Sequence, residues 1–403
     1  MAFLGILVLL GIAVLFSENR KAINLRTVGV AFLLQASFAA FVLYSSTGQD
    51  VLDSVSGVVQ KVIDYSNYGI EFLFGDLGRQ KLGFIFAFNV LPILIFFSSL
   101  MSVLYYLGVM QFVVKTLGGF IKKVMSTGHA ESMSATANIF VGQTEAPLVV
   151  KPYLMGLTRS ELFAVMVGGM ASIAGSVMAG YANMGVELKF LIASSFMAAP
   201  GGLLMAKLIM PETDTPKDQS DYEIEETKEH VNVFDAAAAG ATSGLMLAVN
   251  VGAMLIAFIA LIALLNGMLG GLAEFLGFEG ITLQVLLGWL FAPIAYVIGI
   301  PWEEAVQTGS LLGQKLILNE FVAYIEFLKI KADMAMQSQA IVTFALCGFA
   351  NLSSIAIILG GIGTLVPSRR HEIASIGLKA LLAGTLSNLM SATLAGIFIG
   401  FGS

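Results

Sequence analysis

The chain has 403 residues, of which 57% are hydrophobic and only 12% are charged, with a formal net charge of -6 and a single cysteine. Soluble domains carry about a quarter charged residues, so this composition excludes a water-soluble globular protein and indicates an integral membrane protein. The basic residues are scattered through short loops, which argues against nucleic-acid binding. The lone Cys347 excludes an internal disulfide, and its apolar neighbours predict a small buried side chain.

Apolar stretches long enough to cross a bilayer predict an all-α polytopic protein with eight transmembrane helices. A crossing needs about 17–25 residues. The first stretch resembles the apolar part of a signal peptide, but its basic residues follow it, which is the reverse of a cleaved signal. We therefore expect a first span with an outside N-terminus. The predicted spans are residues 1–16, 27–45, 82–108, 160–184, 187–210, 236–266, 338–363 and 371–401.

Two amphipathic segments, residues 46–81 and 109–125, are predicted to be helices lying at the membrane interface. Eight crossings return the C-terminus to the side of the N-terminus. With both termini outside, the inner segments, Lys207 included, hold 14 of the 21 basic residues. This distribution satisfies the positive-inside rule.

Two segments do not fit simple spans and are predicted to be re-entrant hairpins from opposite faces. Residues 126–157 have basic residues at both ends, and Gly142 and Pro147 argue against an unbroken helix between them. Residues 283–333 are predicted to break at Gly299, Pro301 and Gly309. The start of this second hairpin stays open, because residues 283–300 are apolar enough to cross alone.

The order hairpin, span, span therefore occurs twice, with opposite orientations. Each hairpin is followed by a polar break in the next span, at residues 171–176 and 347–354. Corresponding interruptions in two inverted repeats are typical of a transporter whose binding site lies near the bilayer midplane. The sequence divides into residues 1–125, the first repeat at 126–210, a linker and long span at 211–282, and the second repeat at 283–403.

The polar side chains at these breaks suit a neutral ligand with ring amides and sugar hydroxyls. They offer amide, hydroxyl and carboxylate groups, and no arginine lies nearby to favour an anion. Glu145 and Glu320 are the two carboxylates most deeply set in apolar sequence, so each must be paired, protonated or hydrogen-bonded. For Glu320, the alternative structural partner is Lys315, five residues earlier. The candidate ligand groups belong to Gln143, Thr144, Glu145, Glu320, Asn351 and Ser354.

An alkali cation requires oxygen ligands, and the first hairpin and first break could supply them. The candidates are Asn138, the carbonyls around Val141, and the break at Ser172 and Ile173. The alternative is that Asn138 and Ser172 only cap broken helices. Phe349 could stack on a flat ring, or it could serve only in packing.

Four motifs in this chain resemble those of the concentrative nucleoside transporter family. The similarity covers most of the chain from about residue 82, and the shorter N-terminal part is similar to bacterial members. The motifs are Gly-Gln-Thr-Glu-Ala-Pro-Leu (142–148), Pro-Trp-Glu-Glu-Ala (301–305), Gln-Lys-Leu-Ile-Leu-Asn-Glu-Phe-Val-Ala-Tyr (314–324) and Cys-Gly-Phe-Ala-Asn-Leu-Ser-Ser-Ile (347–355).

The resemblance implies a homotrimer in the bacterial inner membrane. Each subunit would have a scaffold domain, drawn mainly from residues 1–125 and 211–282, and a transport domain formed by the two repeats. An elevator-type movement would import nucleosides such as uridine, cytidine or adenosine by symport with sodium. Proton coupling is the alternative.

By motif position, the resemblance also implies residue roles. The nucleobase would face Gln143, Thr144, Glu145 and Val177. The ribose would face Glu320, Asn351, Ser354 and Phe349. Sodium would be held by the side chains of Asn138 and Ser172 and the carbonyls of Val141 and Ile173.

Two other classes fit the residues less well. An intramembrane enzyme could use buried glutamates, but neither a His-Glu-x-x-His nor a Gly-x-Ser-x-Gly motif occurs. A channel should show repeated rings or a filter. We therefore expect no enzyme activity and no cofactor other than a coupling ion.

Overall fold

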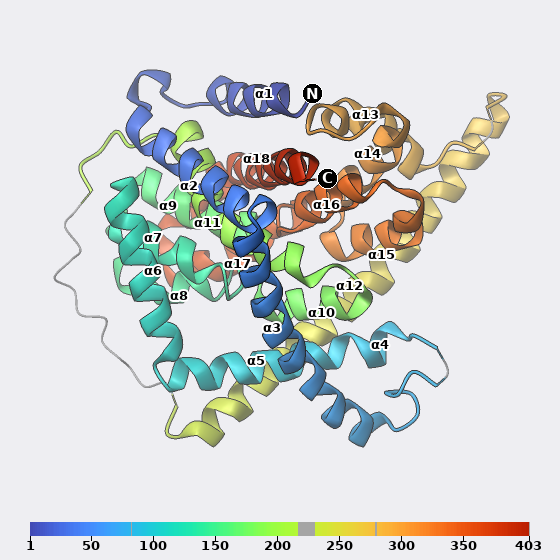
Figure 1. Ribbon diagram of the computed structural model, residues 1–403, viewed down its shortest axis with the longest axis horizontal. Helices are drawn as coiled ribbons and strands as arrows, with labels where there is room; N and C mark the ends of the chain where they lie inside the picture. The colour runs from blue at the N-terminus through green and yellow to red at the C-terminus, as the bar shows by residue number, and fades with distance from the viewer. Residues whose placement is uncertain (82, 217–229, 279, 403) are drawn as a thin grey trace.

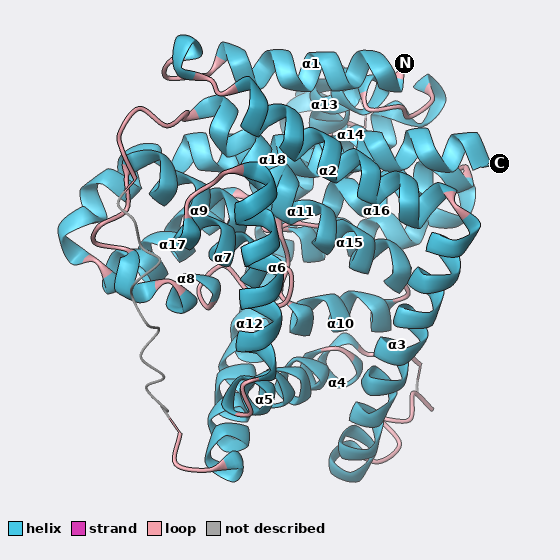
Figure 2. Cartoon of the chain, turned by 60° about the vertical axis from the view of Figure 1, so that its left-hand side comes forward, coloured by secondary structure: helices cyan, strands magenta, loops and turns pink. Residues whose placement is uncertain are grey.

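A computed structural model describes residues 1–81, 83–216, 230–278 and 280–402, and every regular element in those ranges is helical (Figure 2). The acidic part of the predicted linker, residues 217–229, lies outside the described residues together with Lys217 and Lys228. The N-terminal helices are α1 Ala2–Leu15, α2 Leu25–Tyr44, α3 Ser46–Phe74, α4 Phe86–Asn89, α5 Leu91–Tyr106 and α6 Val109–Met125. The all-α prediction is confirmed.

Helices α7 to α11 and α14 to α18 follow the same order: a short helical hairpin, a broken helix and a long helix. The first set is α7 His129–Ala137, α8 Ala146–Val149, α9 Arg159–Ala171, α10 Gly175–Met184 and α11 Leu188–Ile209. The second is α14 Trp302–Ile317, α15 Glu320–Ile330, α16 Met336–Leu346, α17 Leu352–Leu365 and α18 Arg370–Gly402. Helices α12 Val233–Phe275 and α13 Leu283–Val297 lie between them.

Six described segments are long and apolar enough to cross a membrane, with α4 and α5 counted as one and α9 and α10 as one; a bent pair would make seven. They match six of the eight predicted spans. The predicted span at 1–16 is α1, whose 14 residues fall short of a crossing length. The predicted span at 338–363 is not continuous, because the chain leaves the helix between α16 and α17.

The bent pair is α13 and α14. The chain changes direction by 117° at the break between them, which lies inside the predicted second hairpin. Gly299 has φ +113 at this bend, a conformation that favours glycine. The hairpin itself is formed by α14 and α15. Gly309 is not a break, contrary to the prediction. It lies inside α14, where an added Cβ would stand 2.6 Å from Ala292 N, so its small size lets α14 pack closely on α13.

The two predicted amphipathic segments form α3 and α6, and their position at an interface stays a prediction. Polar caps define several helix ends near the breaks. Asn319 accepts a hydrogen bond from Val322 N at the start of α15, and Asn351 caps α17 in the same way. These two asparagines thus start helices at the places where the chain is broken.

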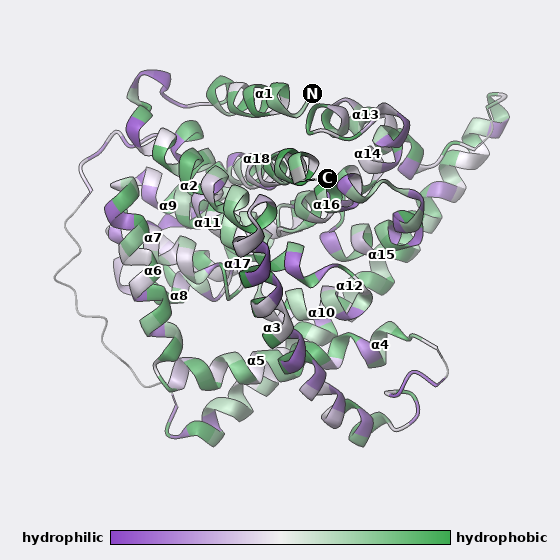
Figure 3. Ribbon diagram, viewed as in Figure 1, coloured by the Kyte–Doolittle hydropathy of each residue, from purple (hydrophilic) through white to green (hydrophobic). Residues whose placement is uncertain are grey.

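Helices α11 and α18 form the centre of the structure, with α9, α16, α2 and α1 packed around them (Figure 1). Helix α12, yellow in Figure 1, runs diagonally across the molecule and packs along α5. Figure 3 shows that α1 and α5 are dominated by hydrophobic residues. Only 17% of the most apolar 18-residue stretch of α12 is buried inside the protein, as expected of a helix that faces lipid.

Two glycines allow α5 and α12 to approach closely. A Cβ on Gly240 would stand 2.6 Å from Ser98 O, and one on Gly244 would stand 2.6 Å from Ile95 Cα. Small residues four positions apart are a common packing device between membrane helices.

We predict that Gly244→Ala lowers the melting temperature of the purified chain in detergent. The added methyl group would overpack the α5–α12 contact, which typically costs about 1–3 kcal/mol. The matched control is Gly267→Ala in the same helix, where no atom lies within 4 Å of an added Cβ. The control should be neutral or slightly stabilising, because alanine favours helix. Equal melting temperatures for the two variants would contradict the close contact.

Candidate transport site

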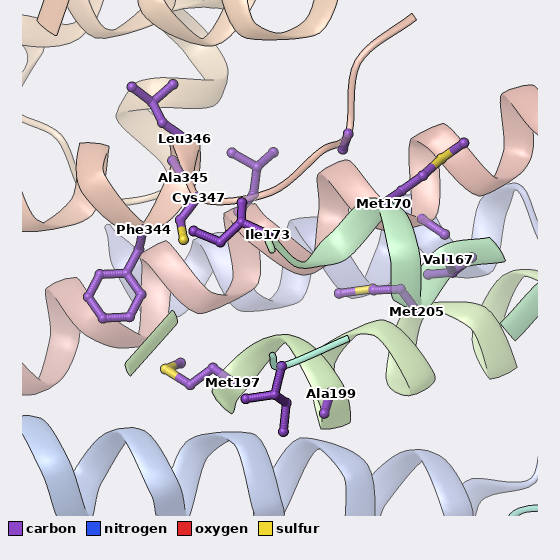
Figure 4. Close-up of a cluster of buried hydrophobic side chains, with 14 of the residues drawn as sticks. Val167, Met170, Ile173, Met197, Ala199, Met205, Phe344, Ala345, Leu346 and Cys347 are labelled. Atoms are coloured by element: carbon purple, nitrogen blue, oxygen red, sulfur yellow. The ribbon is translucent and has the colours of Figure 1, made fainter. Parts of the chain in front are cut away.

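The two helix breaks meet inside the protein. The first comprises Ser172 to Ala174, between α9 and α10, and the second comprises Cys347 to Asn351, between α16 and α17. The backbone N–H of Phe349 donates to the carbonyl of Ser172 at 3.0 Å, so the breaks bond directly to each other. In Figure 4 the side chains of Ile173 and Cys347 lie next to each other. The irregular backbone is therefore enclosed by protein, as membrane depth requires.

The first hairpin and the first break, which carry the predicted cation ligands, are bonded to each other. Gly175 N donates to Phe140 O at 2.9 Å and ties the hairpin to the start of α10. Asn138 ends α7 and is 1% exposed, and its amide Nδ2 donates to Ser134 O at 2.9 Å. This bond orients the side chain, and its Oδ1 is buried without a hydrogen-bond partner.

Ser172 completes this arrangement. It is 2% exposed, and its hydroxyl donates to Gly168 O at 3.0 Å, which leaves the oxygen lone pairs available. Gly168 lies against Asn138, since an added Cβ would stand 3.1 Å from Asn138 Nδ2. Buried oxygens with spare lone pairs on facing elements fit a hard cation without acidic ligands.

The second hairpin places one carboxylate at the other side of the breaks. Glu320 is 3% exposed. Its Oε1 accepts from the Tyr181 hydroxyl at 2.9 Å and its Oε2 accepts from Asn351 Nδ2 at 3.0 Å. Asn351 Oδ1 in turn accepts from Ser354 N at 3.0 Å, and the Ser354 hydroxyl donates to Phe349 O. All four residues that the sequence associates with the ribose therefore lie in one hydrogen-bonded group.

Gln143 connects the first hairpin to this group. Its Nε2 donates to Ser354 Oγ at 3.2 Å, and its Oε1 is buried without a partner. Val177 is buried on α10, while Thr144 and Glu145 are exposed. The Glu145 carboxylate accepts from Gly142 N at 2.9 Å and closes the turn of the hairpin. Glu145 was expected to be deeply set in apolar surroundings, and the structure places it at the exposed edge instead.

Sequence reasoning missed Tyr181, which is fully buried and holds Glu320. It follows Val177 by four positions on α10, so helical spacing could have placed both on one face. The structure does not form the alternative ion pair between Lys315 and Glu320. Lys315 Nζ donates to Ala345 O at 2.8 Å and to Asn388 Oδ1 at 2.7 Å.

A buried ion pair at the base of the first hairpin was also missed. Lys207, expected in an inner loop, is 7% exposed and its Nζ lies 2.6 Å from Glu131 Oε2. The same ammonium donates to Ser160 Oγ at 3.0 Å. Glu131 Oε1 accepts from Gly128 N at 2.6 Å and caps α7. One lysine thus fixes the starts of α7 and α9 against the end of α11.

The sequence matches three family descriptions along nearly its whole length. Residues 4–77 match "Na+ dependent nucleoside transporter N-terminus", 87–187 match "Nucleoside recognition" and 190–396 match "Na+ dependent nucleoside transporter C-terminus". An uncharacterized transporter of Haemophilus influenzae is 56% identical, over 100% of this chain and 98% of its own. Nucleoside permease NupC of Helicobacter pylori is 50% identical, over 98% of this chain and 97% of its own.

Sodium/nucleoside cotransporter 1 of Rattus norvegicus is 38% identical over 98% of this chain, which spans 63% of that longer protein. The solved structure of CNTnw in an inward-facing substrate-bound state is 54% identical. It aligns with a TM-score of 0.96 over 100% of this chain and 98% of its own. Other structures of CNTnw, in outward-facing and intermediate states, align with TM-scores of 0.95 to 0.97.

The fold and the enclosed polar site define a multi-pass membrane transporter and not an enzyme. More particularly, the chain belongs to the concentrative nucleoside transporter family, which confirms the resemblance seen in its motifs.

We predict that Lys207→Met strongly lowers thermal stability. The substitution keeps the volume but leaves the Glu131 carboxylate, 2% exposed, without its cation. Breaking a buried pair from one side typically costs about 3–5 kcal/mol. Melting would be followed by size-exclusion fluorescence in detergent. The control is Lys189→Met, whose exposed ammonium lies 3.8 Å from Asp53 and should matter little. A Lys207→Met protein that melts with the control would contradict this role.

Proposed function

We propose that this protein imports nucleosides by symport with sodium through an elevator-type movement. One observation carries the proposal. Asn138 Oδ1 and Gln143 Oε1 are buried oxygens without partners, five residues apart on one broken hairpin between the crossing breaks. An unsatisfied buried polar group costs about 1–3 kcal/mol. A cation at the first oxygen and a hydrogen-bonding ligand at the second would remove both costs.

The proposed nucleoside site spans the two hairpins. Gln143, with donors and an acceptor, suits the edge of a nucleobase, together with Thr144, Glu145 and the apolar Val177. Glu320, Asn351 and Ser354 suit ribose hydroxyls, with Phe349 beside them. Tyr181 acts as a positioning residue, since its hydroxyl orients Glu320. The contact of Gln143 with Ser354 supports one continuous site for base and ribose.

The proposed sodium ligands are the side-chain oxygens of Asn138 and Ser172 and the carbonyls of Val141 and Ile173. Amide, hydroxyl and carbonyl oxygens do not titrate near neutral pH, so this set favours a metal cation over a proton. Bound sodium would supply the charge that couples nucleoside entry to an ion gradient. Proton coupling is the second candidate.

The proposed moving body comprises residues 126–210 and 283–403, and α5 and α12 belong to the fixed scaffold. Helices α1 and α2 pack on α11 and α18, so we place them with the moving body although residues 1–125 are otherwise scaffold. CNTnw, at 54% identity, has structures titled inward-facing, outward-facing and intermediate, which supports alternating access. We further propose a homotrimer in the bacterial inner membrane with both termini periplasmic.

The central experiment measures uptake of labelled uridine into proteoliposomes under an inward sodium gradient, and again with choline in place of sodium. The proposal expects sodium-dependent accumulation above the outside concentration, with competition by cytidine or adenosine reporting base preference. Uptake driven only by a proton gradient would leave nucleoside transport standing and overturn the sodium site. No nucleoside uptake under either gradient would overturn the substrate class.

We predict that Glu320→Gln weakens uridine binding about tenfold or more while uracil binding changes little. A charged hydrogen-bond acceptor for the ribose is typically worth about 1.5–3 kcal/mol. Isothermal titration of the purified chain in sodium buffer measures both ligands. Glu326→Gln, an exposed change in the same helix, is the control. Equal losses for uridine and uracil would place Glu320 away from the ribose.

We predict that Asn138→Ala shifts sodium activation of uridine uptake to higher concentration, because one oxygen ligand is lost. The expected shift is about tenfold or more, the size reported for perturbed metal-site surroundings. Uptake is measured at graded sodium with ionic strength held constant by choline. Asn67→Ala, an exposed change on α3, should leave the activation curve in place. An unshifted curve for Asn138→Ala would move the ion site elsewhere.

A further inference from the structure

The starting observation is a buried ammonium with no place in the site described so far. Lys315 lies in α14 and is 3% exposed. Among the described residues its hydrogen bonds end on Ala345 O at 2.8 Å and Asn388 Oδ1 at 2.7 Å, and no ion pair joins it to a carboxylate. A charged side chain inside a membrane protein is costly, and such residues are usually functional.

Asn388 carries this contact on to both breaks. It lies in the middle of α18, is 2% exposed, and its Nδ2 donates to Ala171 O at 2.6 Å and to Cys347 O at 3.1 Å. Ala171 is the last residue of α9 and Cys347 follows the last residue of α16. One amide therefore bonds the carbonyl ends of two half-helices, one from each repeat.

These carbonyl ends need positive groups. The last carbonyls of a helix lack partners within it, and the end carries about half a negative charge. Asn388 brings two such ends together, and Lys315 supplies the cation through Asn388 and directly at Ala345. The close approach is built in: a Cβ on Gly348 would stand 2.3 Å from Asn388 Oδ1, so only glycine fits there.

The two repeats differ at this point in an informative way. In the first, the hairpin helix α7 ends at Asn138, whose oxygen is free to bind a cation. In the second, the corresponding helix α14 carries Lys315, three residues before its C-cap Leu318. The second repeat thus places the Lys315 ammonium at its break. The first repeat instead offers the Asn138 oxygen to a free cation.

We propose that Lys315 and Asn388 form a polar bridge that links the ion site to the nucleoside site. Lys315 precedes the ribose-facing Glu320 by five residues in the second hairpin. Ala171 precedes Ser172, a proposed sodium ligand. The bridge holds the second hairpin to the first break, so a shift of that break on sodium binding is transmitted to Glu320. This inference rests on the proposed function, and Lys315 is a positioning residue that touches neither ligand.

A second connection joins the two breaks without Lys315 or Asn388. Phe349 N bonds Ser172 O at 3.0 Å, so the first break also contacts the second directly. From the second break this route continues to the second hairpin, since Asn351 Nδ2 donates to Glu320 Oε2 at 3.0 Å. Among the hydrogen bonds of the described residues, the Lys315–Asn388 contact is the one that ties α14 to the carbonyl ends at both breaks. Removing it should release α14 from the breaks and leave only the route through Asn351, so the coupling should weaken although the breaks stay joined.

The test is the ratio of uridine dissociation constants in choline and in sodium chloride of equal ionic strength, measured by titration of the full chain. In the wild type this ratio should be about tenfold or more, within the range of coupled sites. In Lys315→Met and in Asn388→Asp it should fall below about threefold. Asn388→Asp keeps the size and the attraction to Lys315 but removes both donors. The matched control Lys329→Met removes an exposed lysine from the same hairpin and should keep the wild-type ratio.

A purely structural role would lower the melting temperature yet leave the ratio unchanged in the protein that still folds. An unchanged ratio in Lys315→Met therefore overturns the bridge. If that variant does not fold, Asn388→Asp decides the question in the same way. The double variant should lose no more coupling than either single one, because a bridge needs both ends. Losses that add would also overturn it.

The wild-type arm separates this proposal from the proposed function. A wild-type chain that binds uridine equally with and without sodium contradicts sodium coupling itself, and the bridge falls with it. A wild-type chain with the expected ratio, and variants that keep it, contradict the bridge alone.

Discussion

The structure depends on one constraint: backbone N–H and C=O groups that leave a helix at membrane depth must find partners within the protein. Two helices are interrupted, and each interruption frees polar groups that lipid cannot satisfy. The chain meets this requirement by crossing the breaks, with Phe349 N on Ser172 O, and by sending Asn388 from α18 to the carbonyls of Ala171 and Cys347. Among the buried side-chain oxygens of the described residues that lack a partner, Asn138 Oδ1 and Gln143 Oε1 lie on the first hairpin, where the proposed ligands would bind.

Much of this organisation was predictable because it depends on local signals. Broken segments with polar residues, such as 138–147 and 347–354, stand out in an apolar chain, and the structure has the predicted repeated order, while the inverted orientation of the halves stays a prediction. The prediction failed where local composition does not determine geometry. Gly309 resembles a helix breaker but serves close packing inside α14, and the apolar stretch 338–363 hides a break between α16 and α17. The stretch 1–16 is apolar but forms a helix too short to cross.

The partners of the buried polar groups could not be predicted, since they are separated by long stretches of chain. Tyr181 and Glu320 are 139 positions apart, and Asn388 and Ala171 are 217 apart. Closeness in sequence also suggested a pairing that the structure does not have, between Lys315 and Glu320. Lys315 is five residues from Glu320, but α14 ends and α15 begins between them, and the two side chains have different hydrogen-bond partners. The lysine reaches carbonyl oxygens and the carboxylate reaches a phenol and an amide.

The two hairpins are prepared for a ligand to different degrees. Glu320 already accepts one hydrogen bond on each oxygen, but a carboxylate has about four acceptor positions. Ribose hydroxyls can therefore donate to it without displacing Tyr181 or Asn351. Gln143 is different: its Oε1 has no partner, and its Nε2 makes a long 3.2 Å bond to Ser354 Oγ. A nucleobase would gain both groups by opening that one contact. Under the proposed function, the second hairpin presents a fixed acceptor, whereas the first must rearrange, and the first also carries the proposed cation ligand Asn138. The same segment would therefore respond to both proposed ligands.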